Sequence, residues 1–385
     1  MNQMNQKNQI NQMNQINQMN QINQMNQMNQ INQMKALILS GGHGTRLRPI
    51  TYSQQKQLIP VANKPILFYA IEDVISAGIT DIGIIVGPNK EQVIDAVTRA
   101  NFPAKITFIY QKEPLGLAHT ILISENFLKD APFVMYLGDN ILKGGIKKFL
   151  DKFTTSDADA SILLTPVENP SQFGVAELNS DGSVKRLIEK PKKPPSNLAL
   201  CGIYFFKPPI FKAVKNIKPS FRGELEITDA IQYLLENGFK VHSETVTGWW
   251  KDTGKPEDII EANQLILDDL TPYNKGTLKD STIKGRVAIG KGSIIEKSVI
   301  KGPCIIGENC HIGPDTYIGP YTSIGNNCRI INGEIESSII MDGTEIFCKK
   351  KIVDSLIGKD VKIKERTDLP KGQRFIIGDS SEVEV

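Results

Sequence analysis

Isoleucine recurs every six residues in the C-terminal third of the chain. Without interruption it occupies positions 294, 300, 306, 312, 318, 324 and 330, and the period returns at 340, 346 and 352. A hexapeptide period is typical of a triangular prism that has one short strand on each face and an inward ladder of isoleucines. We therefore expect a parallel β-helix from about Leu278 to Ile363.

Glycine follows the periodic isoleucine in four consecutive steps. These are Ile306-Gly307, Ile312-Gly313, Ile318-Gly319 and Ile324-Gly325. A glycine tolerates backbone angles and close approaches that a side chain would make costly, so these positions are expected at the corners of the prism.

The first 33 residues have a different texture. They are eleven triplets of the form x-Asn-Gln, where x is Met, Ile or Lys. A period of three fits neither a helix nor a strand, and so polar a segment buries too little apolar surface to fold. We expect disorder here, although a self-associating Gln/Asn tract remains an alternative. Met34 is expected to begin the folded chain.

Residues 34–270 alternate short apolar runs with longer amphipathic ones, a pattern that predicts βα units around a mostly parallel mixed sheet. The predicted strands are 35–39, 82–86, 106–110, 133–137 and 161–165, with further strands at 174–178, 184–187, 201–206 and 240–244. The predicted helices are 64–77, 90–100, 117–128 and 145–153. The chain is thus predicted to be an α/β protein with one domain at 34–270 and a β-helix domain with a C-terminal tail at 271–385.

Composition excludes several classes of protein. The formal net charge is only +3, with no long run of like charges, so nucleic acid is not an expected partner. The five cysteines are odd in number and lack CxxC spacing, which argues against a disulfide framework or a zinc site. No apolar stretch approaches the length of a membrane span, and no secretory leader is recognisable, so we expect a cytoplasmic protein and no membrane partner.

A glycine-rich turn follows the first predicted strand. It reads Ser40-Gly41-Gly42-His43-Gly44-Thr45-Arg46, and Lys56 comes ten residues after Arg46. Glycines after a strand let backbone N–H groups approach phosphate oxygens, and the two cations would offset phosphate charge. The turn matches neither GxGxxG nor the Walker A motif, so phosphate binding and an ordinary turn both remain open on these residues alone.

Taken together, these residues resemble the signature of sugar-1-phosphate nucleotidyltransferases, over essentially all of 34–270. Within that family the chain is most similar to the long type of glucose-1-phosphate thymidylyltransferase. The strings that carry the resemblance, in family order, are Gly41-Gly42-x-Gly44-Thr45-Arg46-Leu47-x-Pro49, Lys56-x-Leu58-x-Pro60, Gln111-x-x-Pro114-x-Gly116, Leu137-Gly138-Asp139-Asn140, Phe173-Gly174-Val175, Ile188-Glu189-Lys190-Pro191, Ser196-Asn197, Arg222-Gly223-Glu224-Leu225-Glu226-Ile227-Thr228-Asp229 and Trp250-x-Asp252-Thr253-Gly254.

The resemblance implies a Rossmann-like nucleotidyltransferase domain followed by a left-handed β-helix. It also implies a reaction in which dTTP and glucose 1-phosphate give dTDP-glucose and pyrophosphate. Because two polyanions must meet, the reaction needs charge compensation, which Mg²⁺ supplies with hard oxygen ligands. Asp139 and Asp252 match the family's metal-binding carboxylates, although an aspartate after a strand is often only a turn residue.

The remaining roles are carried over position by position. Catalytic roles fall on Arg46 and Lys56. The nucleotide-binding positions are Gly41, Gly42, Gly44, Thr45, Gln57, Gln111 and Gly116. The sugar-phosphate-binding positions are Asn140, Gly174, Glu189, Lys190, Asn197 and Leu200. A charged strand end before a linker remains the alternative for Glu189-Lys190.

Three roles remain open for the β-helix. It can build a homo-oligomer, a trimer or a multiple of one, through the flat faces of the prism. It can carry an acyl-CoA-dependent acetyltransferase site with His311 as the base. It can also take part in regulation by a small effector.

Alternatives remain for the activity as well. UTP, or a broad range of pyrimidine triphosphates and sugars, is the first of these, and a guanylyltransferase ranks below it because an amide at Gln111 suits a pyrimidine. A non-catalytic regulatory subunit is the alternative from another class. It is disfavoured because Arg46, Lys56, Asp139 and Asp252 are all present.

Overall fold

The computed structural model describes residues 13, 17–19, 25, 29–42, 44–366 and 368–369. The predicted disorder of residues 1–33 therefore lies largely outside the described residues. Residues 29–33 are described, and they are helical, with Ile31 buried beside Gly78. Regular structure thus begins before Met34.

The chain forms two compact units. The first comprises Met1–Gly41, Ala70–Gly138 and Leu142–Trp250, and the second comprises Gly42–Tyr69, Asp139–Ile141 and Lys251–Val385. The boundary between the units therefore differs from the predicted domain boundary near residue 270. The segments Gly42–Tyr69 and Asp139–Ile141, and the residues from Lys251 to 270, pack with the C-terminal residues.

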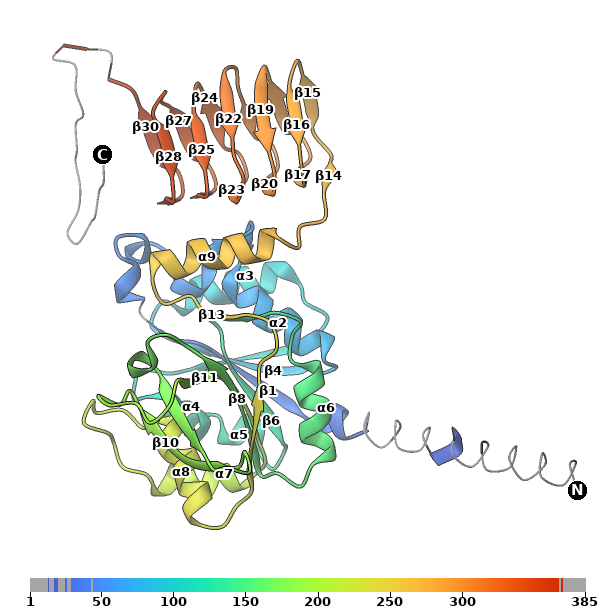
Figure 1. The fold of residues 1–385 in the computed structure, drawn as a ribbon, viewed down its shortest axis with the longest axis vertical. Helices are drawn as coiled ribbons and strands as arrows, with labels where there is room; N and C mark the ends of the chain where they lie inside the picture. The colour runs from blue at the N-terminus through green and yellow to red at the C-terminus, as the bar shows by residue number, and fades with distance from the viewer. Residues whose placement is uncertain are drawn as a thin grey trace, which may run out of the picture. The chain divides into compact units, whose positions relative to one another are not determined.

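A nine-stranded mixed sheet lies at the centre of the first unit (Figure 1). Its strands run in the order β10-β9-β11-β6-β1-β4-β5, and β8 pairs with β11 and β12. The pairs β1–β4, β1–β6, β4–β5 and β8–β12 are parallel, whereas β11 pairs antiparallel with β6, β8 and β9, as β9 does with β10. The strands are β1 (Lys35–Ser40), β4 (Asp81–Val86), β5 (Lys105–Tyr110), β6 (Phe133–Leu137), β8 (Ala160–Pro166), β9 (Gly174–Leu178), β10 (Val184–Glu189), β11 (Leu198–Phe206) and β12 (Val241–Thr245).

Helices cover the sheet of this unit. They are α3 (Lys90–Ala100), α4 (Leu117–Ile123), α5 (Glu125–Leu128), α6 (Lys147–Thr155), α7 (Pro209–Asn216), α8 (Ile227–Glu236) and, from Ala70 onward, α2 (Ile66–Ser76). Helices α4, α7 and α8 contact one another and share a hydrophobic core with Leu37 and Met135, while α6 lies on the other side of the central strands in Figure 1. The α/β class and the mixed sheet are confirmed, but α7 and α8 were absent from the sequence prediction.

The carboxyl edge of the sheet gathers the turns that follow three strands. The sheet extends from β1 to β4 and β5 on one side and to β6 on the other, so a topological switch point lies between β1 and β6. The Gly138 N–H donates to the Leu39 carbonyl at 2.9 Å, and the Gln111 N–H donates to the Val86 carbonyl at 2.9 Å. Ligands bind at such an edge in open α/β sheets.

The second unit contains the predicted β-helix, whose coils stack in succession in Figure 1. The strand pairs of the β-helix are all parallel and fall into three sheets. One face has β14 (Tyr273–Asn274), β17 (Val287–Ile289), β20 (Cys304–Ile306), β23 (Thr322–Ile324), β26 (Ile339–Ile340) and β29 (Leu356–Ile357). The next has β15 (Thr277–Lys279), β18 (Ile294–Glu296), β21 (His311–Ile312), β24 (Arg329–Ile331), β27 (Glu345–Phe347) and β30 (Lys362–Lys364). The third has β16 (Thr282–Lys284), β19 (Ser298–Lys301), β22 (Thr316–Ile318), β25 (Glu334–Glu336) and β28 (Lys351–Val353).

The isoleucine ladders are confirmed except at the first position of the period, although Ile352 at the last position is only partly buried where it packs against the core. Ile300, Ile318 and Ile335 align in register on one face and are fully buried. Ile294, however, is only half-buried, and its neighbour Ile295 takes the core position. The step from Ile295 to Ile300 is five residues, so a strict period of six places Ile294 wrongly.

Glycine at the corners is explained mainly by crowding between coils. A Cβ built on Gly307 would lie 2.6 Å from the Gly325 carbonyl oxygen. Gly313 in addition has a φ of 107°, which favours glycine.

The second unit also contains short elements. They are the 3₁₀ helices η1 (Thr45–Leu47), η2 (Ile50–Tyr52) and η3 (Lys56–Leu58), the hairpin strands β2 (Pro60–Val61) and β3 (Lys64–Pro65), and helix α9 (Pro256–Leu267). The paired strands β7 (Asn140–Leu142) and β13 (Trp250–Asp252) belong to it except for Leu142 and Trp250. Another 3₁₀ helix, η4 (Pro170–Gln172), precedes β9 in the first unit. Helix α9 contacts both β2 and β23. One face of the prism is therefore covered from within its own unit.

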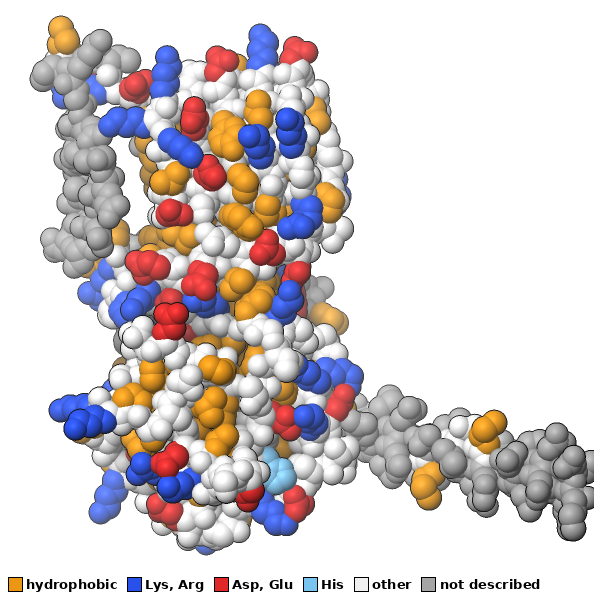
Figure 2. Space-filling view, viewed as in Figure 1, with side chains coloured by type: hydrophobic (Ala, Val, Ile, Leu, Met, Phe, Trp, Pro, Cys, Tyr) orange, Lys and Arg blue, Asp and Glu red, His pale blue; other side chains and the backbone are white. Residues whose placement is uncertain are grey.

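Basic and acidic side chains are interspersed over the described surface of the face shown in Figure 2. Among the described residues, no helix combines the length and apolar character that crossing a membrane requires.

Candidate active site

Lys56 and Asp139 form a buried ion pair in the second unit. Lys56 begins η3 and is only 6% exposed. Its ammonium donates to Asp139 Oδ2 at 2.5 Å, and Asn140 Nδ2 donates to Oδ1 of the same carboxylate at 2.9 Å. Burial acts to raise the pKa of Asp139, but the Lys56 charge and these hydrogen bonds bring the pKa below its ordinary value. Asp139 is thus held as a carboxylate.

Asp252 is held beside this pair by the residue that follows it. The backbone N–H and the hydroxyl of Thr253 both donate to the Asp139 carbonyl, at 3.0 and 2.7 Å. Desolvation, followed by the negative charge of Asp139, raises the pKa of Asp252 to about 6. The two carboxylates therefore repel each other, which is the electrostatic condition that a divalent cation relieves.

Arg46 approaches the same region. A Cβ built on Gly254 would lie 2.9 Å from a terminal nitrogen of Arg46, and the Arg46 charge acts to lower the pKa of Asp252. The structure thus brings together four predicted residues from three distant segments: Arg46, Lys56, Asp139 and Asp252.

Gly44 shapes the turn that leads to Arg46 and Lys56. Its φ is 61°, and a Cβ at this position would lie 2.9 Å from both Lys56 Cβ and Thr51 Cγ2. The Thr51 hydroxyl donates to the Gly44 carbonyl at 2.7 Å. Only a glycine satisfies both the angle and the space, so Gly44 sets the position of the lysine in addition to any contact with phosphate.

Gln57 of η3 approaches Gly42, since a Cβ built on Gly42 would lie 3.7 Å from Gln57 Nε2. Gln57 is buried, and Gln55 Nε2 donates both to its side-chain oxygen and to the Gly42 carbonyl, each at 3.2 Å. Gly42 and Thr45 are exposed. Gln55 was missed by the sequence analysis, and its only signal was its place beside Lys56.

Gln111 lies at the carboxyl edge of the sheet in the first unit. Its Nε2 is 3.0 Å from His119 Nδ1, and a Cβ on Gly41 would lie 3.4 Å from its Oε1. Desolvation lowers the pKa of His119, which favours the neutral ring. His119 was not predicted, although it comes only three residues after Gly116, the last residue of a family string.

The backbone conformation and the close packing at position 116 require a glycine. Its φ is 102°, and a Cβ would lie 2.4 Å from the Leu225 carbonyl oxygen. The Leu225 N–H donates to the Leu115 carbonyl at 2.8 Å, so two backbone segments cross here. Close backbone packing explains this glycine without a ligand.

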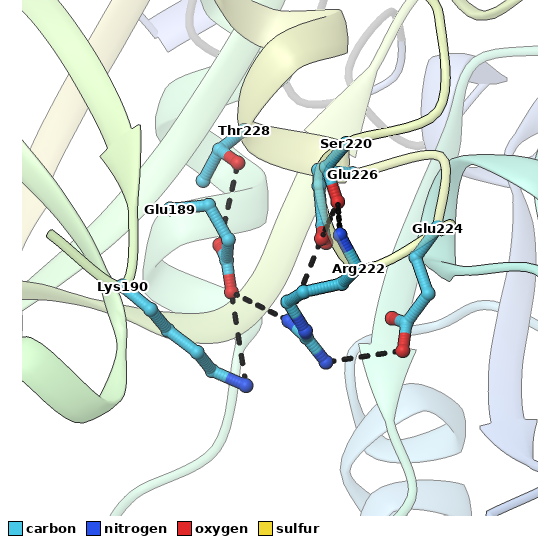
Figure 3. A network of polar contacts seen from close by, with 7 residues as sticks. All are labelled: Glu189, Lys190, Ser220, Arg222, Glu224, Glu226 and Thr228. Carbon is cyan, nitrogen blue, oxygen red and sulfur yellow. Dashed lines mark hydrogen bonds and ion pairs between the residues drawn. The ribbon is translucent and has the colours of Figure 1, made fainter.

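A second polar group surrounds Glu189 in the first unit (Figure 3). Arg222 lies 3.6 Å from Glu189 and also pairs with Glu224 and Glu226, while Lys190 lies 4.0 Å from Glu189. Desolvation, followed by the charge of Glu226, raises the pKa of Glu189. Arg222 was quoted within a family string but had no assigned role.

Gly174 and Leu200 adjoin Glu189. A Cβ on Gly174 would meet Thr228 Cγ2 at 2.7 Å, Glu189 Oε2 at 3.1 Å and Leu200 Cδ1 at 3.6 Å. Thr228 donates its hydroxyl to Glu189 at 3.3 Å. Asn197 is not joined to this group by a hydrogen bond or ion pair among the described residues. Its side chain is exposed and its carbonyl accepts from the Val167 N–H.

The described residues contain no group of three or more His, Cys, Asp or Glu side chains that could hold a metal ion. Among these residues Asp139 and Asp252 therefore lack a third acidic ligand for a shared ion, although the charge of Asp258 also acts to raise the pKa of Asp252. His311 lies on β21 between Ile294 and Arg329 of the adjacent coils, and neither of these residues can orient it as a base.

Comparisons with known proteins identify the family of the chain. The family profile described as nucleotidyl transferase matches residues 35–269, and the profile described as the GMPPB C-terminal domain matches residues 300–385. The chain is 50% identical to a glucose-1-phosphate thymidylyltransferase of Streptomyces antibioticus, over 91% of this chain and 99% of that protein. It is 48% identical to the low-salt glycan biosynthesis nucleotidyltransferase Agl11 of Haloferax volcanii, over 91% of this chain and all of that protein.

A solved structure of a nucleotide-sugar enzyme is also similar to this chain. The crystal structure of a UDP-glucose pyrophosphorylase with UDP-glucose aligns with a TM-score of 0.56 and 28% identity, over 61% of this chain and 98% of that chain. The profile match and the full-length relatives agree with the resemblance inferred from the motifs. The chain therefore belongs to the nucleotidyl transferase family and is a nucleotidyltransferase.

Proposed function

We propose that the chain transfers a thymidylyl group from dTTP to glucose 1-phosphate, giving dTDP-glucose and pyrophosphate. The observation that carries this proposal is the cluster of Lys56, Asp139 and Asp252, in which a buried cation adjoins two carboxylates. The identity of 50% with a thymidylyltransferase that spans nearly the whole of both chains supports the choice of substrates.

In the proposed reaction, a phosphate oxygen of glucose 1-phosphate attacks the α-phosphorus of dTTP. The bond from the α-phosphorus to the bridging oxygen breaks, and that oxygen leaves with its electron pair as part of pyrophosphate. The nucleophile is already an anion at neutral pH, so no general base is required. Arg46 and Lys56 bind the triphosphate and stabilise the charge that develops on the leaving group.

We also propose that the reaction uses Mg²⁺, held by Asp139 and Asp252. Two protein carboxylates suffice for this ion, because phosphate oxygens and waters usually complete its coordination. When bound, the ion neutralises phosphate charge and polarises the reacting phosphoryl group. The fit rests on the environment of Asp252. Desolvation, followed by repulsion from Asp139, raises its pKa to about 6, and a bound cation would offset that repulsion.

The two groups of the first unit are proposed to select the substrates. The Gln111 amide, close to His119, would pair with the imide edge of thymine, with Gly41 beside the amide. Gly116 would serve the nucleotide site only through the backbone packing that it allows. Glu189 would accept hydrogen bonds from the sugar hydroxyls in a pocket bounded by Gly174 and Leu200.

In the first unit, Lys190 and Asn197 would bind the phosphate of the sugar. Asn140 is proposed as a sugar-phosphate-binding residue from the resemblance alone. UTP is the second candidate substrate, because thymine and uracil share the imide edge. The fold similarity to a UDP-glucose pyrophosphorylase favours this alternative.

The test is a panel of pyrophosphate-release assays with four triphosphates and several sugar 1-phosphates, with and without Mg²⁺. The proposal predicts the highest kcat/KM with dTTP and glucose 1-phosphate. A preference for UTP would select the second candidate, and no release with any pair would overturn the proposal.

We further propose that the chain works as a cytoplasmic homo-oligomer, a trimer or a multiple of one, built through the β-helix. Helix α9 covers the face that carries β23, so this role falls on the other two faces. Light scattering of the purified chain measures the copy number.

A further inference from the structure

A tight turn follows the segment that carries Lys56. Strands β2 and β3 are joined by Ala62 and Asn63, whose φ angles are 47° and 62°. Asparagine adopts such angles readily, whereas the Cβ of alanine disfavours them. The conformation of Ala62 therefore depends on support from outside the turn.

Asn263 of α9 provides this support. Its side chain is fully buried, and its Oδ1 accepts from the Ala62 N–H at 2.9 Å. The same oxygen accepts from the Ser323 hydroxyl at 2.6 Å, and Nδ2 donates to the Tyr321 carbonyl at 2.9 Å. Ser323 lies on β23, and Tyr321 is the residue immediately before this strand. A single amide thus joins the turn, α9 and the β-helix.

A second hydrogen bond links the turn directly to the β-helix, because Asn63 Nδ2 donates to the Ile324 carbonyl at 2.6 Å. Backbone hydrogen bonds through Ile59 connect the hairpin that contains this turn to Lys56. The Ile59 N–H donates to the Lys56 carbonyl at 3.1 Å, and the Ile66 N–H donates to the Ile59 carbonyl at 3.1 Å. Ile59 is fully buried. A shift of the turn therefore moves the backbone of Lys56.

We propose that Asn263 is a positioning residue for Lys56, and that the β-helix supports the lysine through Ser323. The coil that contains β23 would then act in the nucleotidyl transfer reaction itself, apart from any role in assembly. This inference rests on the proposed catalytic role of Lys56.

The test compares Asn263→Ala with Gln264→Ala. Gln264 is a matched control, because its Nε2 donates to Ser337 Oγ of the β-helix at 2.7 Å and so ties α9 to the β-helix without reaching the turn. Turnover is measured at 25 °C with the triphosphate and sugar 1-phosphate that the wild type uses best. Asn263→Ala should lower kcat at least about tenfold, with a smaller change in KM, because small displacements of catalytic groups cost much of the rate. Gln264→Ala should stay within about twofold on the same reasoning.

A rescue experiment separates positioning from general stability. Glycine tolerates a positive φ, so adding Ala62→Gly to Asn263→Ala should restore kcat by about threefold or more. Ser323→Ala, which leaves the bond from Ala62 to Asn263 intact, should give a milder loss of kcat than Asn263→Ala. Circular dichroism gives the folded fraction of each variant, and kcat is expressed per folded molecule.

Two results would overturn the inference. One is an unchanged kcat per folded molecule in both Asn263→Ala and Ser323→Ala while Lys56→Met is inactive, which leaves the proposed function intact. The other is a loss of kcat that is equal in Gln264→Ala and Asn263→Ala and that Ala62→Gly does not relieve. A fully active Lys56→Met would instead refute the proposed role of the lysine.

Discussion

Replacing Lys56 by methionine should destabilise the protein and remove its activity together. The substitution keeps most of the side-chain volume but leaves the Asp139 carboxylate without the ammonium that lies 2.5 Å away. Removing one partner of a buried ion pair costs about 3–5 kcal/mol. The Asp139 side chain is still 21% exposed, so we expect the lower end, about 3 kcal/mol. At about 2–4 °C per kcal/mol, the midpoint of thermal unfolding should fall by about 6–12 °C.

The loss of activity has a separate origin. Lys56 is proposed to meet charge that develops on pyrophosphate, and removing one preorganised donor typically lowers kcat by about 10²–10³-fold. Pyrophosphate release at saturating substrates measures this loss, at a temperature at least about 15 °C below the variant's own midpoint so that unfolding does not contribute.

Lys147→Met is the matched control. The Lys147 ammonium also pairs with an aspartate, Asp151, at 2.8 Å, but its side chain is 57% exposed. An exposed pair of this kind contributes about 0–1 kcal/mol, so neither the midpoint nor kcat should change appreciably. The reasoning fails if Lys56→Met unfolds within about 2 °C of the wild type, or if its kcat stays within about threefold.

Three further predictions concern other parts of the molecule. Asp252→Asn should lower turnover by about a hundredfold or more and raise the Mg²⁺ concentration needed for half-maximal rate, and excess chelator should abolish wild-type pyrophosphate release. Glu189→Gln should raise the KM for the sugar 1-phosphate. Folding raises the pKa of Glu189, so the ionised carboxylate destabilises the folded state of the wild type above that pKa. Thermal melts should therefore find Glu189→Gln more stable than the wild type at pH 8. This difference should disappear below about pH 4.5, where the wild-type carboxyl is protonated in both the folded and the unfolded state. Ile318→Ala should cost about 2–5 kcal/mol in denaturant unfolding, whereas Ile294→Ala should cost less than about 1.5, and equal losses would contradict the register of the ladders.

The sequence predicted the β-helix well because its signal is repeated and local. Each coil buries the same residue type at nearly the same spacing, so one slip at Ile294 did not obscure the pattern. In the first unit, helix 90–100 was predicted with its observed ends. Helix α8 was missed because its start was interpreted only as part of the string Arg222–Asp229, although its apolar residues repeat with helical spacing. Helix α7 lies in a segment for which the sequence analysis made no prediction.

The site was predictable in membership but not in geometry. Lys56, Asp139 and Asp252 were chosen by resemblance, and nothing local in the sequence indicates that Lys56 would be paired with Asp139. Gly116 was assigned to the nucleotide, whereas its contact with Leu225 depends on two segments more than a hundred residues apart. Tertiary contacts of this kind, like those of Asn263, leave no periodic trace in the sequence.

The discontinuous second unit has a consequence for synthesis on the ribosome. The segments Gly42–Tyr69 and Asp139–Ile141 leave the ribosome early, yet they pack with residues from Lys251 onward. A nascent chain that stops before Lys251 contains Lys56 and Asp139 but lacks Asp252, α9 and every coil of the β-helix. Translation must therefore deliver the last third of the polypeptide before the first loop can reach its final state, and truncated translation products should accumulate as incompletely folded, inactive chains.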